Sequence, residues 1–206
     1  MTVASDLFSY CRTSGQFRPL SGLPYLSLDL RYATDRNFCR QNLYLGEREA
    51  WLHQEAAEAL DRSAQDLARR HPGWKFRIYD ATRPLSVQRQ LFAAVAGSPR
   101  EPYVANPERG SLHCYGLAVD LGLEDATGRE FDLGTAFDTF DLLAQPQLER
   151  TFFEQGRLLS RQMNLRQALR VSMNSGGFAQ NPMEWWHFDL FPLEQVKGKY
   201  PLVLGT

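Results

Sequence analysis

Two short segments, residues 111–120 and 184–187, constrain the fold of this sequence more than any other feature. The chain has only four histidines, and two of them, His113 and His187, lie in these segments close to acidic residues. His113 and Asp120 are seven positions apart, too far to share one turn of a helix. Any fold that brings these polar side chains together must therefore join two distant parts of the chain.

A loop that bends back into a strand would allow this convergence. Gly116 lies between His113 and Asp120 and permits a sharp bend, because glycine adopts backbone angles that other residues avoid. His187 would come from a neighbouring strand. The three polar side chains would then share one side of a sheet, while alternating apolar residues pack behind them: Leu117, Val119, Trp186 and Phe188.

The residue types in these segments suit a catalytic zinc site. Two imidazoles and one carboxylate leave the fourth tetrahedral position open to solvent. Glu184 comes three residues before His187, so it must precede the strand on a bend, which Asn181-Pro182 can supply. From there Glu184 can act as the general base that takes a proton from the attacking water.

Each residue also has an ordinary structural interpretation. An isolated histidine is commonly a hydrogen-bonded polar residue, and an aspartate at a strand end commonly caps a turn. Glu184 could be a surface carboxylate, and residues 184–187 could be the aromatic edge of a core. The combination argues against these alternatives, because the other two histidines, His53 and His71, lie on or at the end of a predicted helix without acidic partners.

Composition excludes several classes of function. A formal net charge of −1 without a Lys/Arg cluster argues against nucleic-acid binding. No stretch is long and apolar enough to span a bilayer, and residues 1–12 lack the pattern of a signal peptide. Three widely spaced cysteines disfavour a disulfide framework. We therefore expect a cytoplasmic protein, with a periplasmic protein whose leader has been removed as the alternative.

The pattern of apolar residues predicts an α+β fold, with a small, mostly antiparallel sheet that carries the zinc site and packs against helices. We expect a single domain over residues 1–206, with residues 1–45 as an irregular N-terminal arm. Strands are expected at residues 25–31, 74–79, 116–123 and 186–190. Helices are expected at residues 47–70, 83–96 and 150–168, the last continuing or restarting over 166–174, with these buried candidates: Phe152, Phe153, Leu158 and Leu159.

The two segments together resemble the signature of the zinc D-alanyl-D-alanine dipeptidases of the vancomycin-resistance type. That signature is Ser-x-His-x-x-Gly-x-x-x-Asp followed by Glu-x-Trp-His, and it matches Ser111 through Asp120 and Glu184 through His187. Three further motifs resemble those of the dipeptidases: residues 29–38, 80–84 and 134–138. The departures are Ala81-Thr82 and Cys114-Tyr115, which bear on the substrate range more than on the metal.

This resemblance implies roles for seven residues. It implies one zinc ion per chain bound by His113, Asp120 and His187, with Glu184 as the catalytic base. Arg83 would stabilise the developing oxyanion, and Ser111 and Asp138 would hold the free amino end of a small dipeptide. For Arg83 the alternative is an ion pair with Asp80 on the surface, and for Asp138 it is an ordinary solvated position.

Three functions are compatible with this set of residues. The first is a D-Ala-D-Ala dipeptidase. The second is a D,D-carboxypeptidase or L,D-endopeptidase that trims peptidoglycan stem peptides, which needs an open groove. The third is a non-catalytic, zinc-stabilised binding module, which could lose Glu184 or Arg83 freely, whereas this chain has both.

Overall fold

The computed structural model of the chain describes residues 6–205. The first five residues of the expected N-terminal arm, and residue 206 of the expected domain, lie outside this range. The strands are β1 (Phe17–Pro19), β2 (Leu26–Leu28), β3 (Trp51–His53), β4 (Lys75–Asp80), β5 (Ala118–Glu124), β6 (Ala179–Gln180) and β7 (His187–Asp189). The helices are α1 (Ser9–Thr13), α2 (Gln54–Arg70), α3 (Leu85–Ala93), α4 (Glu149–Glu154), α5 (Ser160–Gly176) and α6 (Leu193–Val196).

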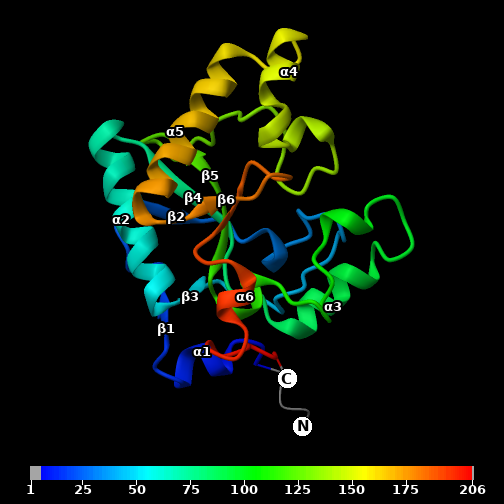
Figure 1. The fold of residues 1–206 in the computed structure, drawn as a ribbon. Helices are drawn as coiled ribbons and strands as arrows, with labels where there is room; N and C mark the ends of the chain where they lie inside the picture. The colour runs from blue at the N-terminus through cyan, green and yellow to red at the C-terminus, as the bar shows by residue number, and fades with distance from the viewer. Residues whose placement is uncertain (1–5, 206) are drawn as a thin grey trace.

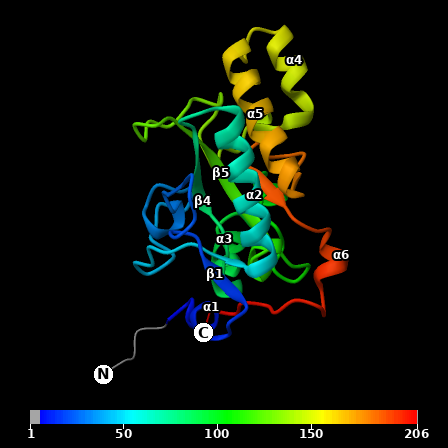
Figure 2. The same cartoon turned by 90° about the vertical axis from the view of Figure 1, so that its left-hand side faces the viewer.

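A five-stranded sheet forms the centre of the fold, in the order β2-β4-β5-β7-β6. The β2–β4 pair is parallel and the other three pairs are antiparallel. Helices α2 and α5 lie side by side along one face of this sheet, and α3 lies on the other side (Figures 1 and 2). A separate pair, β1 with β3, is antiparallel. The predicted α+β fold with a mostly antiparallel sheet is therefore confirmed.

Strand β5 occupies the middle of the sheet, and all seven of its residues are buried. Val119 and Leu121 belong to the main hydrophobic core, together with Leu60 of α2 and Leu169 of α5. Alternate residues of a strand point to opposite faces, so Asp120 points away from these helices. The strand thus has an apolar side that stabilises the fold and a polar side that is available for chemistry.

Two helices begin later than the sequence pattern predicts, because backbone groups before them are already paired. The helix expected from residue 47 begins at Gln54, because Trp51 and His53 belong to β3. In addition, Thr82 N donates to Trp51 O at 2.9 Å, and His53 N donates to Gly116 O at 3.0 Å. The helix expected from Arg83 begins at Leu85. The backbone N–H of Arg83 instead donates to His113 O at 3.0 Å.

The helix expected over residues 150–168 is two helices in the structure. The chain turns at Gly156, whose φ of +70° suits glycine, and this turn separates α4 from α5. Phe152 and Leu158 are buried as predicted, but Phe153 and Leu159 are 43% and 61% exposed, which contradicts the prediction for them. Within residues 6–205, no helix is both long enough and apolar enough to cross a membrane.

Candidate functional site

Strand register places three polar residues in a row across the sheet. Asp120 of β5 is directly opposite His187 of β7, and on its other side it is paired with Asp80 of β4. Residues directly opposite each other on neighbouring strands have side chains on the same face, within contact distance. The pairing of the backbone therefore brings an aspartate and a histidine together although they are 67 positions apart in sequence.

His113 reaches this row from a short 3₁₀ turn, Leu112–Tyr115, that precedes β5. The turn ends at Gly116, which has left-handed backbone angles (φ +66°). A Cβ at this position would lie 2.6 Å from the Phe17 ring and 2.8 Å from His53 N, so only glycine fits. The bend that the sequence predicts at Gly116 is confirmed, and it brings His113 to the polar side of β5.

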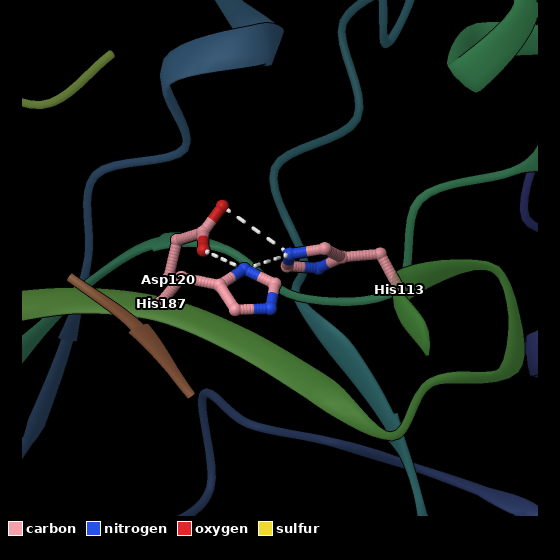
Figure 3. Close-up of side chains that lie close together, drawn as sticks. All are labelled: His113, Asp120 and His187. Carbon is pink, nitrogen blue, oxygen red and sulfur yellow. Dashed lines mark hydrogen bonds and ion pairs between the residues drawn. The ribbon is translucent and has the colours of Figure 1, made fainter. Parts of the chain in front are cut away.

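The three side chains converge on one point, with Asp120 and His187 next to each other and His113 reaching toward them from a separate segment (Figure 3). His187 Nδ1 is 2.9 Å from Asp120 Oδ1 and 3.1 Å from His113 Nε2. His113 Nε2 is 3.4 Å from Asp120 Oδ2. Ligand atoms about 2.05 Å from a tetrahedral zinc ion are about 3.3 Å apart, so this spacing fits such an ion.

The outer nitrogens of both rings are occupied by partners that set their tautomers. His113 Nδ1 lies 2.6 Å from Ala81 O and donates to it, and His187 Nε2 lies 2.9 Å from Asp189 Oδ1. When both rings are neutral, their inner nitrogens therefore point lone pairs at each other and at the Asp120 carboxylate, an arrangement that a cation between them stabilises. Burial lowers the pKa of His187, but Asp189 and Asp120 raise it well above its ordinary value. The site thus favours positive charge at its centre.

Glu184 lies beside this centre on the segment that leads into β7. Its Oε2 is 4.0 Å from His187 Nδ1, and Asn181 Oδ1 accepts from Met183 N at 2.8 Å in the bend before it. Burial raises the pKa of Glu184 to about 7. A carboxyl group with a pKa near neutrality can both accept and release a proton.

Arg83 is buried and held by several partners. Its Nε donates to Asp80 Oδ2 at 2.9 Å and its Nη1 to Gln88 Oε1 at 2.8 Å. Its Nη2 lies 3.4 Å from Asp120 Oδ2. The ion pair with Asp80 that we considered as the ordinary alternative is present, but it is buried beside the histidines and not on the surface.

Asp138 lies on the loop of residues 131–141, which we call the Asp138 loop. Its Oδ1 accepts from Tyr32 Oη at 3.0 Å, whereas its Oδ2 is buried and has no hydrogen-bond partner within residues 6–205. Burial raises the pKa of Asp138 to about 8. Its backbone has a φ of +62°, which is uncommon for a residue with a side chain.

One cavity of about 300 Å³ is lined by all seven residues singled out in the sequence: Arg83, Ser111, His113, Asp120, Asp138, Glu184 and His187. Its volume is at the small end of the range for small-molecule sites. Ser111, at the start of the turn that carries His113, is buried on this lining. The arrangement can bind a metal ion, move a proton and hold a small charged molecule.

Three further residues of the site were not identified from the sequence. Asp189 could have been found, because it comes two residues after His187 and so shares its face of the strand. Tyr32 is 106 positions from Asp138, and Ala81 contributes only its backbone carbonyl. Neither of these last two contacts has a local sequence signal.

Comparisons with known proteins find one family for this chain. A family model described as D-Ala-D-Ala dipeptidase matches residues 17–203, which include all seven residues. A D-alanyl-D-alanine dipeptidase of Escherichia coli (strain K12) is 33% identical over 180 residues, covering 87% of this chain and 84% of the relative. A protein of the same name from Synechocystis is 27% identical over 175 residues, 70% of this chain and 71% of the relative. One from Enterococcus faecalis is 28% identical over 179 residues, which cover 79% of this chain and 84% of the relative.

Proposed function

The chain belongs to the D-Ala-D-Ala dipeptidase family, and on this premise we propose that it hydrolyses the dipeptide D-alanyl-D-alanine. One observation carries the proposal. A small cavity combines three convergent metal-ligand atoms with Asp138, a carboxylate that has a buried oxygen without a partner. A zwitterionic dipeptide suits such a cavity, because its ammonium can pair with the carboxylate and its peptide bond can lie near the metal.

The ion we propose is zinc, one per chain, held by His113, Asp120 and His187. Two imidazole nitrogens and a carboxylate oxygen are ligands that zinc accepts, and three protein ligands leave a position open for chemistry. When bound, zinc supplies Lewis acidity that polarises a carbonyl and makes water more acidic. The hydrogen bonds from His113 to Ala81 and from His187 to Asp189 hold both rings in the orientation this requires.

Glu184 is the proposed general base. The oxygen of water forms a bond to the peptide carbonyl carbon while a carboxylate oxygen of Glu184 takes the proton. Glu184 then passes this proton to the amine as the C–N bond breaks. A raised pKa, about 7, makes both transfers accessible near neutral pH.

Arg83 is proposed to stabilise the negative charge that develops on the carbonyl oxygen. Because Asp80 and Gln88 hold its guanidinium in place, little reorganisation is needed when that charge appears. Losing a donor of this kind typically costs roughly 3–4 kcal/mol of transition-state stabilisation. The planar fork of arginine is suited to this role, and it remains charged throughout.

Asp138 and Ser111 are proposed to bind the free amino end of the substrate. Burial raises the pKa of Asp138 because one oxygen of the ionised carboxylate lacks a partner, and a substrate ammonium beside it would stabilise the ionised form. A longer peptide presents an uncharged amide nitrogen at the same place, which leaves the carboxylate unpaired. This contact favours the dipeptide over peptidoglycan stem peptides.

The test compares three substrates with the zinc-loaded protein: D-Ala-D-Ala, its N-acetylated form and a stem pentapeptide. We expect the free dipeptide to have the highest kcat/KM, with activity lost on chelation and restored by zinc. A higher kcat/KM for the pentapeptide would favour the carboxypeptidase or endopeptidase. Zinc binding without hydrolysis of any of the three would favour the non-catalytic module.

A further inference from the structure

A fully buried arginine on α5, Arg166, binds the backbone on both sides of Asp138. Its Nε donates to Leu133 O at 2.7 Å, and its Nη2 donates to Leu143 O at 3.0 Å. Leu133 is five residues before Asp138 and Leu143 is five residues after it. One planar guanidinium therefore fixes the distance between the two ends of the segment that carries this carboxylate.

The same guanidinium also contacts the segment that carries Glu184. It lies over the ring of Trp185, 5.8 Å from the centroid, and Trp185 follows Glu184 directly. The indole Nε1 of Trp185 donates to Thr135 Oγ1 on the Asp138 loop at 2.7 Å. Arg166 thus lies where the loop and the segment leading into β7 meet.

The Asp138 loop depends on such contacts, because it has no regular secondary structure between Phe131 and Asp141. Asp138 itself has a positive φ, a strained conformation for a residue with a side chain that persists only when surrounding contacts impose it. Among residues 6–205, its side chain has one hydrogen bond, from Tyr32. The placement of the carboxylate therefore relies on contacts of its loop: the Phe137 ring packs against Tyr32, Tyr79 and Trp186, and Arg166 holds the two ends.

We propose that Arg166 is a positioning residue that sets the place of Asp138, and so sets the preference of the enzyme for a free amino end. The inference rests on the proposed dipeptidase function, since Asp138 acts here by binding the substrate ammonium. Arg166 does not line the cavity. It acts through the backbone of the loop, as supporting residues of a functional site do.

Arg170, one helical turn further along α5, provides a matched control. It binds both oxygens of Glu149, at 3.0 and 2.8 Å, and donates to Gln180 Oε1 at 2.6 Å, but it has no hydrogen bond to the Asp138 loop. Arg166 also lies near Glu149, with Nη1 3.4 Å from Oε1. Glu149 therefore keeps one arginine partner in either single variant, which avoids an unpaired buried charge.

The experiment measures the ratio of kcat/KM for D-Ala-D-Ala to that for N-acetyl-D-Ala-D-Ala, using zinc-loaded wild type, Arg166→Met, Arg166→Lys and Arg170→Met. A smaller folded fraction lowers both rates equally and leaves this ratio unchanged. We expect Arg166→Met to lower the ratio by about tenfold to a hundredfold, as displacement of a binding group by about 1 Å can do. Arg170→Met should leave it at the wild-type value.

Arg166→Lys keeps a positive charge near Glu149, so the same ratio can be measured with this variant if Arg166→Met does not fold. An ammonium is a point charge without the planar fork that spans both carbonyls, so we expect the ratio to fall here too. A wild-type ratio in a folded Arg166 variant, with both rates reduced in parallel, would overturn the inference and leave Arg166 a purely structural residue.

Hydrogen exchange of the amides of residues 131–143 tests, without any substrate, whether Arg166 holds the two ends of this segment. We expect faster exchange in the Arg166 variants than in wild type or Arg170→Met, and equal exchange would overturn the inference. This measurement also separates the two hypotheses. If the wild type does not hydrolyse D-Ala-D-Ala, the proposed function fails while exchange still decides whether Arg166 holds the loop.

Discussion

The two sides of the cavity are built in different ways. On the sheet side, Asp120 and His187 are placed by the pairing of β5 with β7, and the outer nitrogen of each histidine has a hydrogen-bond acceptor. On the loop side, Asp138 lies on an irregular segment with a positive φ and has a carboxylate oxygen without a partner. Backbone pairing places the first group, and side chains from other elements place the second.

This difference separates chemistry from selection. A change on the sheet side removes the metal ligands that every substrate requires, so all substrates should be affected together. A change on the loop side alters the group that would bind the ammonium, so one substrate should be affected more than another. Substitutions on each side can therefore be distinguished by comparing substrates.

The largest effect is expected from His187→Ala or His113→Ala. Either change leaves two ligands, and even outer partners of a metal ligand are worth about 10–100-fold in affinity, so a ligand itself should be worth more. We expect zinc to be absent after purification and hydrolysis of every substrate to be lost. Elemental analysis beside wild type measures this, and one zinc per chain in either variant would contradict the assigned ligands.

Glu184→Gln should separate metal binding from catalysis on the sheet side. The amide cannot accept a proton, and general acid–base catalysis typically contributes about 10²–10⁴-fold, so turnover should fall by that amount. Zinc content should stay at the wild-type level, which provides the control within the same sample. Activity above about a tenth of wild type would be inconsistent with a general base at this position.

Asp138→Asn tests the loop side directly. The neutral amide loses the charged contact with the ammonium, which we expect to cost the free dipeptide roughly 2–5 kcal/mol in transition-state binding. The N-acetylated dipeptide should change little, so the preference between the two substrates should shrink. If kcat/KM fell equally for both substrates, the loop side would not select between them, and the proposed difference between the two sides of the cavity would be wrong.

The smallest effect is expected from Asp189→Asn, which changes the outer partner of His187 without removing a ligand. Zinc should bind about 10–100-fold more weakly. Competition against a chromogenic chelator measures the affinity, and Glu194→Gln, a change to an exposed carboxylate, is the control. Unchanged affinity would show that the hydrogen bond from His187 to Asp189 does not tune the metal.

The sheet side was largely predictable from the sequence, for a physical reason. The spacing of His113, Gly116 and Asp120, and the alternation around His187, are local patterns that a bend and two strands explain. The loop side was not predictable in the same way. That Tyr32 and Arg166 hold Asp138 and its loop depends on contacts across the whole fold, and only the resemblance pointed to Asp138.

The two errors in secondary structure have different origins, and only the first resembles that of the loop side. The helical pattern before Gln54 was genuine, but long-range backbone bonds place Trp51 and His53 in a strand, and tertiary pairing overrides local propensity. The turn at Gly156 was missed because an isolated glycine does not always end a helix. At residues 51–53 the missing information was which distant segment lies alongside, whereas the backbone bonds around Gly156 are local.

The register that joins Asp120 to His187 also links metal binding to folding. The two residues are 67 positions apart, so an unfolded chain separates them and offers no assembled site. An ion that binds only the folded state stabilises it by about 2.7 kcal/mol when its free concentration is about 100 times its Kd. The melting temperature of this protein should therefore rise with the concentration of free zinc around it.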